Sequence, residues 1–83
     1  MFYVYLLQSF VDATFYVGFT ENLEKRVEEH NAGKSIYTSR KIPWKLVYSE
    51  KFEIKSDALK REKFLKKQRN KDFYHRLIKT LDR

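Results

Sequence analysis

A single carboxylate lies at an unusual place on the second helix that the sequence predicts. On a helix over residues 57–69, Glu62 falls inside the arc of apolar side chains, at about 100° of rotation per residue. Burying an unpaired charge there would cost several kcal/mol, so Glu62 needs a cation, either a basic side chain or a metal ion. Lys66, one turn further along, offers an ordinary helix ion pair as the simpler alternative.

The residues around Glu62 suit a metal site beside a nucleic acid. From residue 60 to residue 71 the chain carries seven Lys or Arg and one acid, a composition that attracts phosphates. Mg²⁺ keeps most of its waters and takes one or two carboxylates together with phosphate oxygens. Calcium or zinc cages would need more protein ligands. The chemistry that this pattern favours is a divalent ion held between one carboxylate and a phosphate backbone.

The helix expected over residues 22–32 also turns polar side chains inward. Arg26 and His30 lie one turn apart on the side of Leu23 and Val27, the side that a helix presses against a small sheet. Taken singly, an arginine would more often extend outward along its stem, and a histidine would more often be a satisfied core residue. Together they indicate polar groups aimed at the sheet.

Alternating aromatic segments predict that sheet. Residues 2–7 and 15–20 each place apolar side chains on one face and tyrosines, Tyr5 and Tyr16 among them, on the other. Residues 44–49, extendable to 52, predict a third strand. We expect the polar side chains of both helices to be turned toward the tyrosine-bearing face.

Capping residues set the expected limits of the helices. Thr20 or Asn22 caps the first helix, Ser56 caps the second, and Asn70 separates the second from the last. A basic loop follows the first helix over residues 33–43. The last helix is amphipathic through residues spaced by three and four, namely Phe73, Leu77, Ile78 and Leu81.

The charge of the chain is concentrated toward one end. Residues 1–54 hold seven basic and seven acidic residues, whereas residues 55–83 hold eleven and four, so the whole net charge of +7 lies in the second stretch. A polyanion is the expected partner, unless the basic helices serve only as a solvated surface.

Length and composition exclude several classes of protein. A chain of 83 residues allows one domain. Because it has no cysteine, disulfide scaffolds and zinc fingers are excluded. No apolar run approaches the ~20 residues of a membrane span, and no secretory signal is recognisable. We expect a cytoplasmic protein.

Motifs spread along nearly the whole chain resemble the GIY-YIG nuclease superfamily. They are Tyr3-Val4-Tyr5 and Tyr16-Val17-Gly18, then Arg26 and His30 on the next helix and Glu62 on a later one. The chain looks like the small single-domain bacterial branch, related to domains of excision-repair nucleases and homing endonucleases, and segments 31–34 and 37–40 support that branch. Tyr3 stands where the superfamily has glycine, and Val4 and Val17 stand where it has isoleucine.

The resemblance implies a fold and an activity. The fold is α+β, with a small three-stranded antiparallel sheet flanked by about three helices in the order β-β-α-β-α-α, forming one domain over residues 1–83. The activity is hydrolysis of phosphodiester bonds in DNA, extending to structured or damaged DNA and DNA repair, with one Mg²⁺ or Mn²⁺. The alternative is a non-catalytic module that has the same fold and binds DNA or RNA. A third hypothesis is a protein-interaction domain with a solvated basic face.

By position, the resemblance also assigns roles to individual residues. Tyr5 and Tyr16 flank the attacked phosphate, with Tyr16 favoured as the base; Arg26 stabilises phosphate charge, His30 assists proton transfer or orients a tyrosine, Glu62 holds the metal, and Gly18 leaves space for backbone or substrate. Nucleic-acid contacts are expected from Lys34, Tyr37, Arg40 and Lys66. A tyrosine phenol, with a pKa normally near 10, needs neighbouring positive charge to serve as a base near neutral pH.

Overall fold

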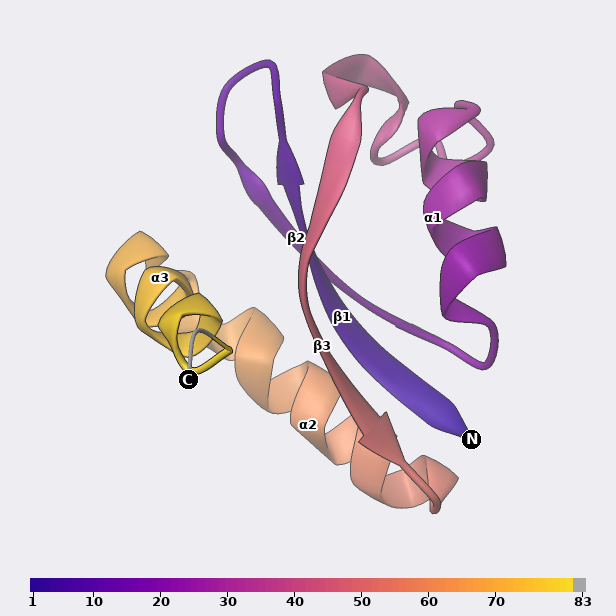
Figure 1. Ribbon diagram of the computed structural model, residues 1–83, viewed down its shortest axis with the longest axis vertical. Coiled ribbons are helices and arrows are strands. Elements are labelled where there is room, and N and C mark those ends of the chain that lie inside the picture. Colours follow the sequence, from indigo (N-terminus) through magenta and orange to yellow (C-terminus); the bar gives the residue numbers. More distant parts are fainter. Residues whose placement is uncertain (82–83) are drawn as a thin grey trace.

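The computed structural model describes residues 1–81 and shows one three-stranded sheet with three α-helices (Figure 1). The strands are β1 (Phe2–Ser9), β2 (Phe15–Thr20) and β3 (Trp44–Phe52). The helices are α1 (Leu23–Asn31), α2 (Lys55–Gln68) and α3 (Lys71–Lys79), and a 3₁₀ turn, η1 (Ser39–Lys41), precedes β3. The predicted α+β fold and the order of its elements are confirmed. Within residues 1–81, no helix has the length and apolar character needed to cross a membrane.

The central strand is β1, which pairs antiparallel with β2 on one side and with β3 on the other. Strand β2 is therefore an edge strand. Tyr5 pairs with Gly18, so both residues belong to the same face of the sheet. Opposite Leu6 and Leu7, the register with β3 shifts by one residue, which leaves Val47 as a bulge.

Helices cover both faces of the sheet, with α1 on one side and α2 and α3 on the other (Figure 1). One core contains Val4, Leu6, Val17, Ala58, Leu65 and Tyr74, and the second contains Tyr5, Leu7 and Trp44 with Leu23 and Val27 of α1 packed against them. The tyrosine-bearing face thus meets α1, as predicted. The same prediction is wrong for α2, because the wholly apolar face also needs a cover and the buried stripe of α2 provides it.

Of the two predicted helix caps, one is confirmed and one is wrong, and Asn70, predicted only to interrupt the helical segment, also acts as a cap. The side chain of Asn22 accepts a hydrogen bond from the backbone N–H of Lys25 at the start of α1, and Asn70 caps α3 in the same way. Ser56 lies inside the first turn of α2, which begins two residues earlier than expected. The cap position falls on Ile54, whose side chain makes no capping hydrogen bond.

The predicted apolar stripe of the last helix is confirmed in part. Phe73, Leu77 and Ile78 pack against the core beneath α2. Leu81 lies beyond the end of α3 and is 55% exposed, so its assignment to the stripe is wrong. The hydroxyl of Tyr74 donates to the backbone carbonyl of Leu65 at 2.7 Å, which ties α3 to α2.

Candidate active site

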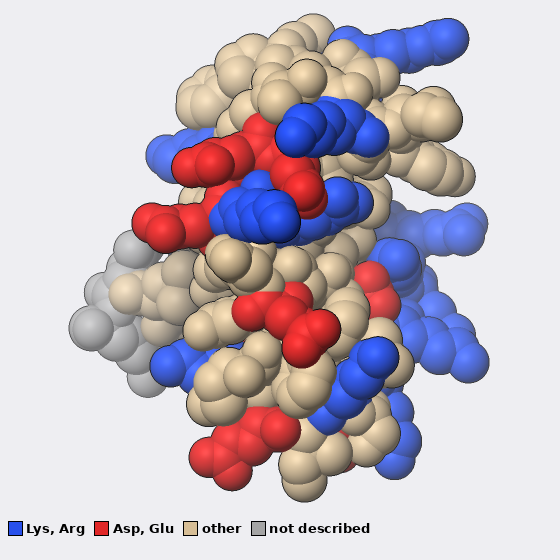
Figure 2. Space-filling model, turned by 90° about the vertical axis from the view of Figure 1, so that its right-hand side faces the viewer, with Lys and Arg blue, Asp and Glu red and all other residues tan. Residues whose placement is uncertain are grey.

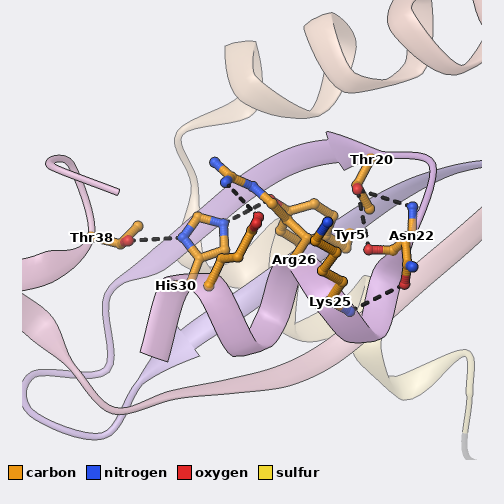
Figure 3. Close-up of polar contacts among 8 residues, drawn as sticks. Tyr5, Thr20, Asn22, Lys25, Arg26, His30 and Thr38 are labelled. Carbon is orange, nitrogen blue, oxygen red and sulfur yellow. Dashed lines mark hydrogen bonds and ion pairs between the residues drawn. The ribbon is translucent and has the colours of Figure 1, made fainter. Parts of the chain in front are cut away.

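A buried chain of hydrogen bonds joins β1, α1 and the loop after α1 (Figure 3). The hydroxyl of Tyr5 lies 2.8 Å from Nε2 of His30, and Nδ1 of His30 lies 2.8 Å from Oγ1 of Thr38. None of the three residues is more than 1% exposed. Both ring nitrogens of His30 therefore have a partner, and its predicted inward position is confirmed.

Thr38 is a member of this chain that the sequence does not mark. It lies in the basic loop, where polar residues are expected to be exposed, yet it is buried. Its backbone carbonyl accepts a hydrogen bond from the indole of Trp44 at 2.9 Å, and its N–H donates to Ser35. Threonine in a loop usually forms local turns, so no sequence pattern distinguishes this residue from its neighbours.

The phenol of Tyr5 is held in its protonated form. Burial raises the pKa of Tyr5 to about 12, and the charges of Tyr16 and Glu62 act in the same direction. The guanidinium of Arg26, which lies next to Tyr5 in Figure 3, opposes the increase. Near neutral pH, the hydroxyl of Tyr5 can therefore donate a hydrogen bond to His30, but Tyr5 is poorly suited to act as a base.

Arg26 lies at the boundary between the buried chain and solvent. Its side chain is 33% exposed, and its guanidinium contacts Glu29 at 3.2 Å. An ion pair this exposed is weak. The guanidinium is thus available to an incoming anion, beside the buried hydroxyl of Tyr5.

Gly18 makes room for Tyr5. A Cβ atom at Gly18 would overlap Cζ and Oη of the Tyr5 ring. The space expected for backbone or substrate is therefore filled by the protein's own phenol, and that prediction is wrong. Glycine is required here because Tyr5 lies across it, with its hydroxyl directed to His30.

The substitution Gly18→Ala is expected to destabilise the fold by about 1–3 kcal/mol, because the added methyl group must displace a ring that is buried and hydrogen-bonded. Urea denaturation of the two proteins measures this difference. The double variant Gly18→Ala/Tyr5→Leu removes the end of the ring and should recover part of the loss. If Gly18→Ala alone unfolds at the wild-type urea concentration, Tyr5 is not confined as described.

Tyr16 lies between the buried chain and a groove along the outer edge of β2. Its ring centroid is 6.5 Å from that of Tyr5 and 5.1 Å from that of His30. The edge groove has a volume of about 630 Å³ and is lined by Phe15, Tyr16, Val17, Tyr37, Lys66, Arg69, Lys71 and Tyr74. Of the two predicted catalytic tyrosines, Tyr16 is half-buried and open to this groove, whereas Tyr5 is buried.

A second hollow adjoins the edge groove and contains Glu62. It has a volume of about 520 Å³, and its lining residues are Glu62, Lys63, Lys66, Lys67 and Arg69. Lys66 and Arg69 line both spaces. The carboxylate of Glu62 is 18% exposed and lies 3.3 Å from Nζ of Lys66. The helix ion pair considered from the sequence is therefore present.

Glu62 belongs to the layer opposite α1, but its charge still acts on Tyr5. It is one of the groups that raise the pKa of Tyr5. Helix α2 packs against both β1, which carries Tyr5, and β2, which carries Tyr16, so Glu62 lies across the sheet from the two tyrosines. The predicted residues Tyr5, Tyr16, Arg26 and His30 lie together on the α1 side of the sheet. Glu62 lies on the opposite side, on α2.

The donor set at Glu62 fits only one kind of metal site. Among residues 1–81, no three His, Asp or Glu side chains are grouped closely enough to hold an ion. A site built by protein ligands alone is therefore not supported. One carboxylate in a basic hollow does fit Mg²⁺ or Mn²⁺, whose other ligands are waters and substrate phosphate oxygens.

The predicted nucleic-acid contacts divide into two pairs. Tyr37 and Lys66 line the edge groove. Lys34 and Arg40 are exposed but line neither the groove nor the Glu62 hollow. Figure 2 looks toward the α1 side, where acidic and basic side chains are mixed, and the charged side chains that project beyond its right-hand edge are Lys or Arg.

Stability is expected to fall as the pH drops below about 6.5, because of His30. Burial and then the charge of Arg26 lower the pKa of His30 from its usual 6.5, against the opposing charge of Glu29. The unfolded chain therefore binds a proton at a higher pH than the folded chain does, which favours unfolding as the pH decreases. Melting temperatures measured between about pH 5 and pH 7.5 give the slope of stability against pH.

The variant His30→Gln should lessen that slope, whereas His75→Gln, which changes an exposed histidine, should leave it intact. An unchanged slope in His30→Gln would show that other groups cause the acid sensitivity.

Known proteins match this chain over most of its length. A family model described as the GIY-YIG catalytic domain matches residues 1–76. A UPF0213 protein of Natronomonas pharaonis is 48% identical over 65 residues, which cover 77% of this chain and 75% of that protein. A UPF0213 protein of Bacillus licheniformis is 43% identical over 75 residues, covering 87% and 76%. No solved structure matches the chain.

Proposed function

The chain belongs to the GIY-YIG family, and we propose that it is an endonuclease that hydrolyses phosphodiester bonds of DNA with one divalent metal ion. The observation that supports this best is that Tyr16 and Glu62 border two adjoining basic spaces that share Lys66 and Arg69. A nucleic-acid backbone bound there would meet a phenol on one side and a carboxylate on the other. Action on structured or damaged DNA and a cytoplasmic location stay predictions.

Tyr16 is the proposed acceptor of the proton from the attacking water. It opens to the edge groove, whereas Tyr5 is buried and protonated. Tyr5 instead positions His30 through the hydrogen bond of its hydroxyl, and the rings of Tyr5 and His30 both pack against the ring of Tyr16. Arg26 exchanges its weak contact with Glu29 for a phosphate oxygen and stabilises the charge that develops on it.

Glu62 is the proposed metal ligand, and Mg²⁺ or Mn²⁺ bound there would stabilise negative charge on the phosphate. The lysines beside Glu62 attract the backbone. Lys66, which forms an ion pair with Glu62 in this structure, is one of these lysines and could contact a phosphate of the bound backbone.

A non-catalytic nucleic-acid-binding module is the second candidate, and the ion pair between Glu62 and Lys66 favours it. In such a module the carboxylate would serve to order Lys66. Binding would still weaken steeply as salt rises, because phosphate contacts release counterions.

The test is to incubate the purified protein with supercoiled, branched and single-stranded DNA in Mg²⁺, in Mn²⁺ and in EDTA. We expect cleavage of at least one DNA with metal and none in EDTA. If the protein binds these DNAs but cuts none of them with either metal, the binding module replaces the nuclease.

A further inference from the structure

We propose that the edge groove holds an unpaired nucleotide, which makes single-stranded DNA the substrate class of this nuclease. The inference rests on the proposed function for the cutting step, but the binding step can be tested without it. It is supported by an exposed aromatic residue, a strained arginine and the distribution of charge on the two sides of the groove.

The aromatic residue is Tyr37, which is 88% exposed and lines the same groove as Tyr16. Its neighbour Thr38 is fixed by hydrogen bonds to His30 and Trp44. An exposed ring on an anchored loop is already positioned for a ligand, which lowers the entropic cost of binding. Aromatic rings stack on nucleobases with about 1–3 kcal/mol per base. In a duplex the faces of a base are covered by its neighbours, so this ring selects unpaired bases.

The strained residue is Arg69, at the corner between α2 and α3. Its backbone is left-handed, with φ of 44° and ψ of 35°. Glycine is the usual residue at such a helix end, and other residues adopt this conformation at a cost of about 1–2 kcal/mol. What arginine supplies in exchange is a guanidinium where the edge groove and the Glu62 hollow meet. Backbone strain of this kind is concentrated at functional sites.

The charge of the groove is one-sided. Lys66, Arg69 and Lys71 line it from the α2–α3 layer, and none of the groove's lining residues is acidic. Tyr37 comes from the loop after α1, which belongs to the opposite layer, and β2 lies between them. Cations on one wall and an aromatic ring on the other match the phosphate side and the base side of a single strand.

The first experiment measures binding by fluorescence anisotropy in EDTA, so that cutting plays no part. Labelled oligothymidine is compared with a duplex of the same length, and we expect tighter binding of the single strand. Tyr37→Ala should weaken single-strand binding by about 5- to 150-fold, whereas Tyr37→Phe should bind as wild type. Ile36→Ala is the matched control, because it removes a neighbouring side chain that is 94% exposed and not aromatic.

Arg69→Gly separates the role of the side chain from that of the backbone. The glycine relieves the left-handed strain, so the melting temperature should be unchanged or higher. Single-strand affinity should nevertheless fall, and the slope of log K against log salt should decrease by about 0.7 for one lost phosphate contact. Arg69→Lys should restore the slope. A loss of affinity together with a loss of stability would assign Arg69 a structural role and contradict the inference.

Other outcomes separate this inference from the proposed function. Equal affinity for single strand and duplex, with no effect of Tyr37→Ala, would overturn the inference even if the protein cuts DNA. Tyr37-dependent binding of single strands without any metal-dependent cutting would uphold the nucleotide site in the edge groove and overturn the proposed nuclease. Tighter binding of oligouridine than of oligothymidine would overturn the assignment to DNA.

Discussion

Tyr16→Phe is expected to lower the rate of DNA cleavage by about 10²- to 10⁴-fold, the usual effect of losing a general base. The substitution removes only the hydroxyl of a tyrosine that lines the edge groove. The ring remains, with its contacts to His30 and Trp44 at centroid distances of 5.1 and 6.2 Å. Folding and DNA affinity should therefore stay at their wild-type values, so that the loss appears in kcat and not in KM.

The matched control is Tyr3→Phe, which makes the same chemical change on β1, at a tyrosine that does not line the edge groove. It should cut DNA at the wild-type rate. If Tyr5→Phe stops cleavage while Tyr16→Phe does not, the base is Tyr5, despite the burial that raises its pKa to about 12.

Glu62→Gln is expected to lower cleavage by on the order of 10³-fold, because a metal ion contributes several kcal/mol to charge stabilisation in the transition state. Stability should change little, since the lost ion pair with Lys66 involves a lysine that is 53% exposed. Affinity for DNA should be unchanged or higher, because one negative charge leaves a basic hollow.

Binding of Mn²⁺, followed by electron paramagnetic resonance in the presence of DNA, measures the same role without cleavage. We expect Glu62→Gln to lose the bound signal and Glu53→Gln, which changes an exposed carboxylate, to keep it. A Glu62→Gln variant that retains both Mn²⁺ and cleavage would reduce Glu62 to a partner of Lys66.

Much of this site follows from local patterns in the sequence. The alternation in the first two strands places Tyr5 and Tyr16 on one face, and the periodicity of α1 turns His30 toward them. Both features are present, with Tyr5 and His30 in hydrogen-bond contact. Each depends on residues close in sequence, which is why a pattern could identify it.

The remaining features depend on contacts that periodicity cannot describe. The stripe of α2 shows which side of that helix is buried, but not which face of the sheet covers it. The pattern therefore predicts Glu62 on the tyrosine-bearing side, whereas α2 covers the apolar face. Gly18 faces a ring from another strand. Thr38 is buried because the loop folds back onto α1 and β3. All three are tertiary packing effects.

The measurement that tests the proposed nuclease most directly is single-turnover cleavage by wild type, Tyr16→Phe and Glu62→Gln, purified in the same way. Each is mixed in excess with end-labelled single-stranded and branched DNA in Mg²⁺, and binding is measured in parallel. We expect all three proteins to bind and only the wild type to cut. Equal cutting by all three, or binding without cutting by any, would contradict a catalytic site built on Tyr16 and Glu62.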